Sequence, residues 1–101
     1  MRESAAQGTI VPSVFALGAI SPNPTRGSVH LAFNVARESW IDIDMLDVQG
    51  GTVAVLAHGV WPAGRHVIEW PPGGGTQAAG IYFARYRYLS GEAIRKLIVT
   101  P

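Results

Sequence analysis

Large apolar residues alternate with polar or small ones along most of this chain. The clearest run is the segment 28–35, in which every second residue is bulky and apolar: Val29, Leu31, Phe33 and Val35. Successive side chains of a β-strand point to opposite faces of its sheet, so this pattern predicts a strand with one buried face. No helix-length window keeps the apolar spacing of i, i+3, i+4 and i+7 that marks an amphipathic helix.

Glycines and prolines divide the chain into seven such segments. We expect strands over residues 13–20, 28–35, 40–48, 53–57, 65–70, 80–89 and 92–100. The glycine turn at 50–51 predicts a hairpin between the third and fourth strands, and the proline- and glycine-rich stretch 71–79 predicts a loop. In the third strand, Asp42 and Asp44 are expected to face water. The last strand contains consecutive apolar residues, so its pattern leaves the inward face undetermined.

The whole chain has 101 residues, which is the size of one domain and of a seven-stranded sandwich. We therefore expect an all-β fold, an antiparallel, seven-stranded immunoglobulin-like β-sandwich over residues 9–101, preceded by a flexible N-terminal segment at 1–8. An open barrel is the alternative arrangement of the same strands. Hydrophobic residues make up 48% of the chain and charged residues 15%, so a core can form without metal or disulfide cross-links.

Charge and cysteine content exclude several classes of partner and site. The net charge is +1, which gives no reason to expect a nucleic-acid partner. The chain has no cysteine, so disulfides and thiolate zinc sites are excluded. No apolar run is long enough to predict a membrane span. Residues 1–8 lack the pattern of a signal peptide, so we expect an export signal to belong to a longer parent chain.

The polar residues do not predict a catalytic or metal site. His30, His58 and His66 have no partner at metal-ligand spacing. The aspartates of the segment 42–47 could form a small acidic patch that suits calcium, but a solvated strand face explains them equally well. No serine lies in a nucleophile elbow, and the glycines at 73–75 lack the lysine of a phosphate-binding loop. We therefore expect a protein that is not an enzyme and needs no cofactor or metal.

Aromatic residues are the remaining candidates for ligand contact. The ones considered are Trp40, Trp61, Trp70, Tyr82, Tyr86 and Tyr88. Exposed rings on a sandwich can bind sugars by stacking, whereas buried rings fill the core, which is the commoner role. Trp61 precedes Pro62 in a predicted turn and is expected to be the most exposed, so it is the candidate ligand-binding aromatic.

Six short motifs follow one another in a recognisable order over residues 22–101. They are Pro22-Asn23-Pro24, the alternation from Val29 to Phe33, the strand and turn at 41–50, the Ala-Gly-Arg-His turn at 63–66 with the following Trp70, the Gly-Ile-Tyr run at 80–82, and the final Lys96-Leu97-Ile98-Val99. In this order they resemble two overlapping bacterial families. One is the C-terminal sorting domain of type IX secretion, and the other is the immunoglobulin-like domain of the flagellar hook-capping protein.

The resemblance to sorting domains implies a function. It implies a non-catalytic C-terminal module of a larger secreted bacterial protein, which an outer-membrane secretion machine recognises after export to the periplasm. The N-terminal passenger would then be secreted or held at the cell surface. The docking residues that the motifs imply are Pro22, Asn23, Pro24, Gly80, Tyr82, Lys96, Leu97, Ile98 and Val99. A sorting domain ends its parent chain, and Pro101 closely follows the last expected strand.

Some motif residues also have expected structural roles. Gly50 and Gly80 permit backbone conformations that are closed to other residues. Tyr82 offers a buried ring whose hydroxyl can anchor a corner of the sandwich. The likeness to the hook-capping domain leaves a second function open, a structural module that makes protein–protein contacts in an assembly. Carbohydrate binding or adhesion through Trp61 is a third.

Overall fold

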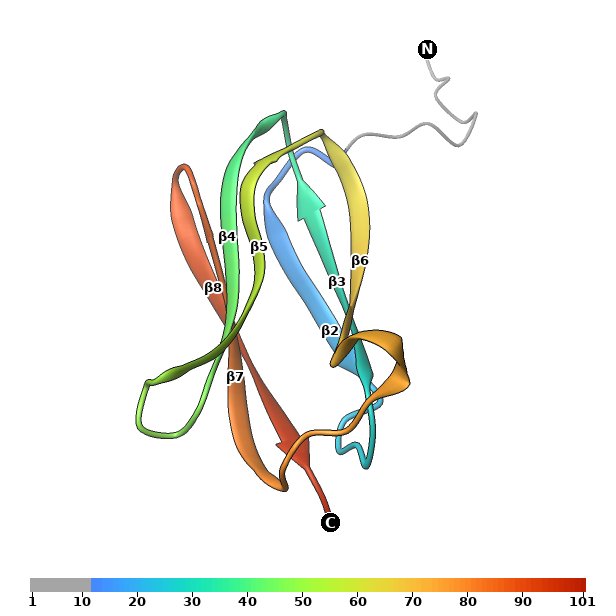
Figure 1. Cartoon of the computed structure of the whole chain (residues 1–101). Helices are drawn as coiled ribbons and strands as arrows, with labels where there is room; N and C mark the ends of the chain where they lie inside the picture. Colours follow the sequence, from blue (N-terminus) through green and yellow to red (C-terminus); the bar gives the residue numbers. More distant parts are fainter. Residues whose placement is uncertain (1–11) are drawn as a thin grey trace.

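Seven β-strands make up most of the chain in the computed structural model, which describes residues 12–101 (Figure 1). They are β2 (Ala16–Ser21), β3 (Val29–Val35), β4 (Ser39–Leu46), β5 (Thr52–Trp61), β6 (Gly64–Trp70), β7 (Gly80–Tyr88) and β8 (Gly91–Val99). Across residues 12–101 the only helical element is a 3₁₀ turn, η1 (Pro72–Gly74), within the loop predicted at 71–79. The flexible segment predicted at 1–8 lies outside the described residues.

The strands form two antiparallel sheets that lie face to face (Figure 1). One sheet has the order β2-β3-β6 and the other β5-β4-β7-β8. The chain passes between the sheets after β3, after β5 and after β6, which is the kind of Greek-key connection that immunoglobulin-like sandwiches use. The predicted seven-stranded sandwich is therefore confirmed, and the open barrel is excluded.

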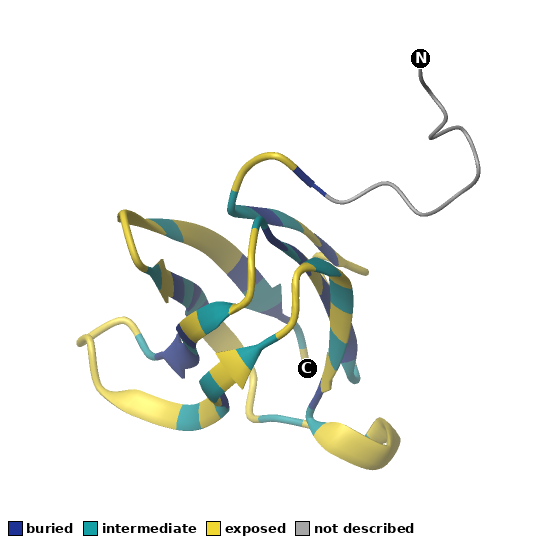
Figure 2. Ribbon diagram, turned by 90° about the horizontal axis from the view of Figure 1, so that it is seen from above, coloured by how far each residue is buried: buried dark blue, intermediate teal, exposed yellow. Residues whose placement is uncertain are grey.

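The core lies between the two sheets and follows the alternation of the strands. In β3, all four apolar residues predicted to share a face are buried. β4 and β7 supply the opposite side, with Ile43 beside Tyr86 and Met45 beside Ala84. Figure 2 shows buried and exposed positions alternating along the strands. Burying a large apolar side chain stabilises a fold by about 1.5–3 kcal/mol, so this alternation fixes the register of both sheets.

Strand boundaries differ from the prediction most at β5. The prediction stopped at residue 57, but β5 runs on through Gly59 to Trp61. Its pairing with β4 continues to Ser39, which gives these backbone groups hydrogen-bond partners that the sequence pattern does not reveal. At the same end of the sandwich, β2 begins at Ala16 and not at residue 13.

The inward face of β8, which the sequence left undetermined, carries Leu97 and Val99. Both side chains are buried, whereas Ile98 between them is partly exposed. Leu97 lies opposite Tyr82 of β7. The pairing with β7 therefore settles which of the consecutive apolar residues enters the core.

The turn between β4 and β5 is closed by Asp47. One carboxylate oxygen, Oδ1, accepts hydrogen bonds from the backbone N–H groups of Gln49 and Gly51, both at 2.9 Å. Gly50 has a φ of +85°, a left-handed conformation that favours glycine. Asp47 is thus committed to the turn, and the predicted hairpin is confirmed.

Candidate functional site

The Pro22-Asn23-Pro24 motif lies against the last strand of the sandwich. The Asn23 side chain donates a hydrogen bond from Nδ2 to the Lys96 carbonyl at 2.8 Å. It also accepts one at Oδ1 from the Ile98 backbone N–H at 3.0 Å. The amide group therefore acts on β8 as the backbone of a neighbouring strand would, by offering one donor and one acceptor.

Thr25 extends this contact with its own backbone. Its N–H donates to the Ile98 carbonyl at 2.9 Å, and its carbonyl accepts from the Thr100 N–H at 2.7 Å. Together these bonds form a parallel bridge between Thr25 and Val99. We call residues 22–25, together with the part of the chain they contact at 96–100, the terminal clip.

The terminal clip covers part of an exposed sheet edge. β8 is the outer strand of the four-stranded sheet, and unpaired backbone groups on such a strand are open to pairing with other chains. The clip pairs outward-facing backbone groups from Lys96 to Thr100. Nearby, the Arg95 guanidinium donates to the Leu17 carbonyl of β2 at 2.9 Å. The two sheets are therefore joined along this side by β2, the clip and β8.

The structure divides the predicted docking residues into a surface group and a core group, with Ile98, which is partly exposed, between the two. The exposed ones are Pro22, Asn23, Pro24, Gly80 and Lys96. The buried ones are Tyr82, Leu97 and Val99, which are between 0% and 6% exposed. Side chains in the second group are held in the core, so a docking partner cannot contact them in the folded domain. The surface group gathers at one end, because Asn23 contacts β8 and Gly80 lies opposite Val99.

Tyr82 anchors the corner where β7 begins, as predicted. Its hydroxyl donates to the Ala78 carbonyl at 2.6 Å. Its ring packs against Trp70 in an edge-to-face arrangement, with ring centroids 5.6 Å apart. Gly80, two residues before it, has a φ of +155°. This bond ties the end of the η1 loop to the core next to the terminal clip.

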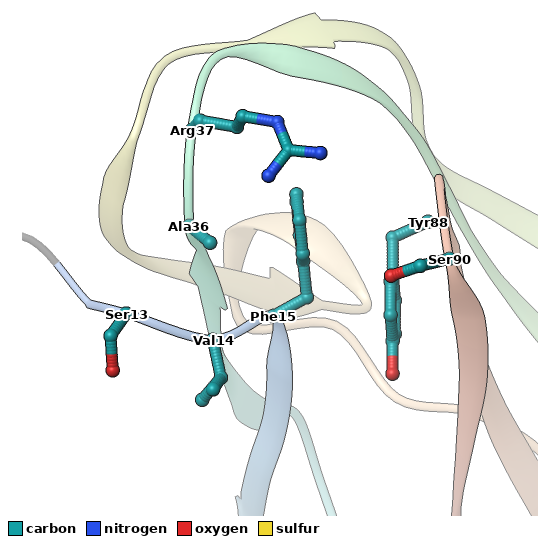
Figure 3. A pocket seen from close by; sticks show the side chains of 7 residues that line it. All are labelled: Ser13, Val14, Phe15, Ala36, Arg37, Tyr88 and Ser90. Atoms are coloured by element: carbon teal, nitrogen blue, oxygen red, sulfur yellow. The ribbon is translucent and has the colours of Figure 1, made fainter.

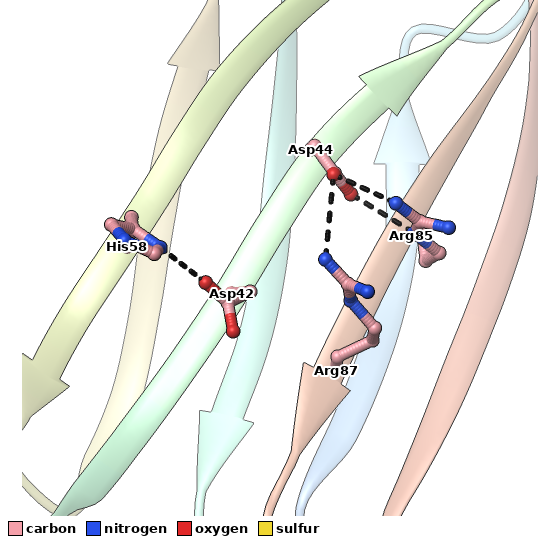
Figure 4. A network of polar contacts seen from close by, with 5 residues as sticks. All are labelled: Asp42, Asp44, His58, Arg85 and Arg87. Atoms are coloured by element: carbon pink, nitrogen blue, oxygen red, sulfur yellow. Dashed lines mark hydrogen bonds and ion pairs between the residues drawn. The ribbon is translucent and has the colours of Figure 1, made fainter. Parts of the chain in front are cut away.

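Charged side chains cross the outer face of the four-stranded sheet (Figure 4). The prediction that Asp44 faces water is wrong, because this residue is only 8% exposed. Arg85 of β7 donates two hydrogen bonds to its carboxylate, at 3.2 and 3.0 Å, and Arg87 lies 3.8 Å away. The hydrogen bonds to Asp44 raise the pKa of the Arg85 guanidinium. Asp42 is paired with His58 of β5.

These pairings leave no acidic patch of the kind considered for calcium. Each strand aspartate has a cationic or imidazole partner, and Asp47 caps its own turn. Between residues 12 and 101 no three histidine, aspartate or glutamate side chains come together in a way that could hold a metal ion. Each aspartate of this segment therefore has a partner within the folded domain.

The prediction that Trp61 is the most exposed tryptophan is wrong. Trp61 is partly buried and packs against Phe33, with ring centroids 5.4 Å apart, and against His66 at 5.1 Å. The most exposed tryptophan is Trp40, at 52%. Its position could have been found from the alternation of β4, because Trp40 shares the parity of the outward-facing Asp42.

A shallow cavity of about 370 Å³ lies at the opposite end of the sandwich from the terminal clip. Figure 3 shows the side chains that line it. Its lining residues are Ser13, Val14, Phe15, Ala36, Arg37, Tyr88 and Ser90. The rings of Phe15 and Tyr88 stack at 5.0 Å, and the Arg37 guanidinium lies 5.9 Å from the Phe15 centroid. The lining contains no carboxylate or imidazole, so it provides no general acid or base of the usual kinds.

Comparisons with known proteins do not assign this chain to a family. No family model matches the chain, and no curated protein or solved structure shows a significant match. Within the part of the chain that the structure describes, no helix is long and apolar enough to cross a membrane. The class defined by the coordinates is an antiparallel β-sandwich whose last strand is bound by the terminal clip.

Proposed function

We propose that this chain is a non-catalytic sorting module of a larger secreted bacterial protein, recognised by an outer-membrane secretion machine. The observation that supports this most is the pair of hydrogen bonds from Asn23 to Lys96 and Ile98. They join the first and last of the motifs that carry the resemblance to sorting domains. Asn23 precedes Lys96 by 73 positions and Ile98 by 75 positions in the chain. Segments far apart in the sequence thereby contribute to one surface.

The docking surface in this proposal is the exposed part of the terminal clip. Pro22 and Pro24 contribute rigid apolar contacts, and Lys96 contributes a positive charge. Ile81 adds apolar area, because it is 43% exposed and lies opposite Ile98. Since the clip is already held by hydrogen bonds, a partner would bind it without ordering a loose segment, which reduces the entropic cost of binding.

The position of the passenger also fits this role. β2 begins at the end of the sandwich opposite the C-terminus (Figure 1). A passenger joined N-terminal to β2 would therefore be attached far from the docking surface. In this proposal the folded module is recognised by its shape and surface chemistry, and its buried residues act by holding that surface in place.

A reporter fusion tests the proposal. A reporter with a periplasmic export signal is fused in front of the full chain and expressed in a bacterium that has a type IX secretion system. We expect the reporter to become accessible to protease on intact cells, and to remain periplasmic in a strain without the secretion system. A reporter that stays in the periplasm of the competent strain, although the fused domain is folded, contradicts the proposal.

A second candidate function is a structural module that assembles with copies of itself, and the edge strand β5 favours it. β5 has ten residues, contains no aspartate, glutamate, lysine or arginine, and forms the outer edge of its sheet. Its Val55 and Val60 side chains are 65% and 60% exposed. Long uncharged edges of this kind are open to pairing with another strand.

Analytical ultracentrifugation over a wide concentration range distinguishes the two functions. Assembly through β5 predicts a dimer or larger species that Val55→Lys reduces, because a lysine on an edge strand opposes strand pairing. Val67→Lys is the matched control, since Val67 is equally exposed on β6 of the other sheet. A monomer at every concentration excludes self-assembly and leaves sorting in place.

A further inference from the structure

Trp40 presents a large apolar ring to solvent on the outer face of the four-stranded sheet. The indole belongs to a residue that is 52% exposed, whereas Trp70 is 5% exposed and lies in the core. Large aromatic rings contribute most when buried, so this ring leaves apolar area that is available to a ligand. The Trp40 ring lies outside the core, because Ile41, the next residue, fills the buried position in this part of β4.

Three hydrogen-bonding side chains lie on the same face of the sheet as this ring (Figure 4 draws the three). Asp42 follows Trp40 on the outward side of β4. His58 of β5 lies directly opposite Asp42, and its ring meets Trp40 in a perpendicular arrangement with centroids 5.0 Å apart. Arg87 of β7 lies opposite Asp42 on the other side. β4 and β5 therefore place Asp42 and His58 next to the indole, while Arg87 lies beyond Asp42 and reaches toward Asp44.

These groups retain hydrogen-bonding capacity for a ligand. The Nδ1 atom of His58 is held by Oδ1 of Asp42, so Nε2 is the ring nitrogen left to accept or donate. The other oxygen of Asp42 can accept further hydrogen bonds. Arg87 keeps donors to spare, because a guanidinium has five N–H groups and its ion pair with Asp44 is a loose contact of 3.8 Å. The His58 and Arg87 side chains are 65% and 46% exposed.

An apolar plane bordered by such donors and acceptors matches the chemistry of a sugar. A pyranose ring has an apolar C–H face that stacks on an aromatic ring, and its hydroxyl groups both donate and accept hydrogen bonds. The charges around the site are balanced, since Asp42 and Asp44 are matched by Arg85 and Arg87. A balanced site gives no attraction for a nucleic acid or another polyanion. A sheet face without a deep pocket suits an extended polymer better than a small molecule.

We propose that Trp40, Asp42, His58 and Arg87 bind a neutral glycan chain of hexopyranoses. Trp40 stacks on one sugar ring, Asp42 and His58 bind its hydroxyl groups, and Arg87 binds a hydroxyl group further along the glycan chain. This site is separate from the terminal clip and does not depend on the sorting function. A module that carries both would contact a secretion machine through its C-terminal end and a polysaccharide through the outer face of β4, β5 and β7.

Isothermal titration and ¹⁵N–¹H NMR of the full chain test the proposal, with cellohexaose and chitohexaose as the two probes. We expect saturable binding of at least one probe, with shifts at the Trp40 indole N–H and at the amides of Asp42 and His58. Trp40→Ala is expected to weaken binding roughly fivefold or more, because stacking on an aromatic ring contributes about 1 kcal/mol or more. Arg87→Met, which keeps a long side chain without its donors, is expected to weaken binding as well.

Trp61→Phe is the matched control. Trp61 packs on Phe33 and His66, and phenylalanine keeps an aromatic ring in that place, so this variant is expected to bind as the wild type does. Circular dichroism establishes that each variant is folded. The proposal is overturned by the absence of saturable binding to both probes, by unchanged affinity in folded Trp40→Ala, or by an equal loss in Trp61→Phe.

Discussion

At the scale of single residues, the centre of the core is a tyrosine that connects the two sheets. Tyr86 is fully buried, and its hydroxyl donates to the Asn34 carbonyl of β3 at 2.7 Å. Its ring meets Phe33 at 5.5 Å in an edge-to-face arrangement. Burial away from water disfavours the phenolate and raises the pKa of Tyr86 to about 12, with a smaller contribution from Tyr88.

This pKa predicts how stability changes in alkali. In the unfolded chain a tyrosine titrates near pH 10, so between pH 10 and 12 the unfolded state loses its proton while folded Tyr86 keeps it. Stability from this residue is therefore constant below about pH 9 and falls as the pH rises toward 12, by roughly 2–3 kcal/mol in all. Urea unfolding measured from pH 8 to 11.5 is expected to show this fall.

Tyr86→Phe provides the control for this titration. The variant has no hydroxyl to ionise and loses the bond to Asn34, so it is expected to be about 1 kcal/mol less stable at pH 8 and to show a much shallower alkaline fall. An alkaline fall of the same size in Tyr86→Phe would assign the effect to other groups. The alternation along β7 places this tyrosine on the same face as Ala84 and Tyr82, but its partner across the sandwich depends on how the sheets meet.

The burial of polar residues was harder to predict than that of apolar ones, because it depends on neighbours from other strands. The alternation placed Asp44 correctly on the outer face of β4, but it did not reveal that Arg85 and Arg87 cover it. Burial of a charged residue depends on its cross-strand neighbours, and these come from a strand about forty positions further on. Trp61 was misplaced similarly, because the turn at Pro62 indicated exposure while Phe33 and His66 cover its ring.

At the scale of elements, the least expected feature is that the Asn23 side chain bonds to the edge of β8 as a neighbouring strand would. Both halves of the terminal clip were singled out from sequence motifs, but their contact could not be derived from spacing, since more than seventy residues separate them. The position of β5 beside β4 followed from the turn at 50–51, whereas its length did not. Gly59 and Val60 break the alternation, and only the pairing with β4 shows that the strand continues.

The clip is expected to protect the end of β8 from local opening. Asn23→Ala removes one donor and one acceptor and is expected to destabilise the domain by about 1–2 kcal/mol. The larger effect is expected in native-state hydrogen exchange, where the Ile98 amide loses its acceptor and exchanges faster. Amides in the middle of β3 should be unaffected beyond the change in global stability.

Asn23→Asp separates the two bonds of the clip. Aspartate keeps the acceptor for the Ile98 N–H but has no donor for the Lys96 carbonyl, so exchange at Ile98 is expected to remain slower than in Asn23→Ala. If Ile98 exchanges at the wild-type rate in Asn23→Ala, the side chain is not what holds the clip.

At the scale of the whole molecule, the alternation and turn residues were enough to predict the seven strands and the sandwich. They did not predict which strands share a sheet, because that depends on the order in which the chain crosses between layers. The partition places β8 at an edge next to β2, and β5 at the opposite edge of the same sheet. Among residues 12–101, one edge is bound by the terminal clip and no strand pairs with the other, so the two edges differ chemically.

The direct test of the sorting function is the surface-exposed fraction of a reporter fused in front of this chain, compared between two charge-reversal variants. Lys96→Glu changes an exposed residue of the terminal clip, and Arg65→Glu makes the same kind of change on β6 of the other sheet. Both variants should remain folded. We predict that Lys96→Glu lowers surface exposure of the reporter and that Arg65→Glu does not. Equal delivery by both variants would contradict the clip as the docking surface, and failure of the wild-type fusion to reach the surface would contradict sorting itself.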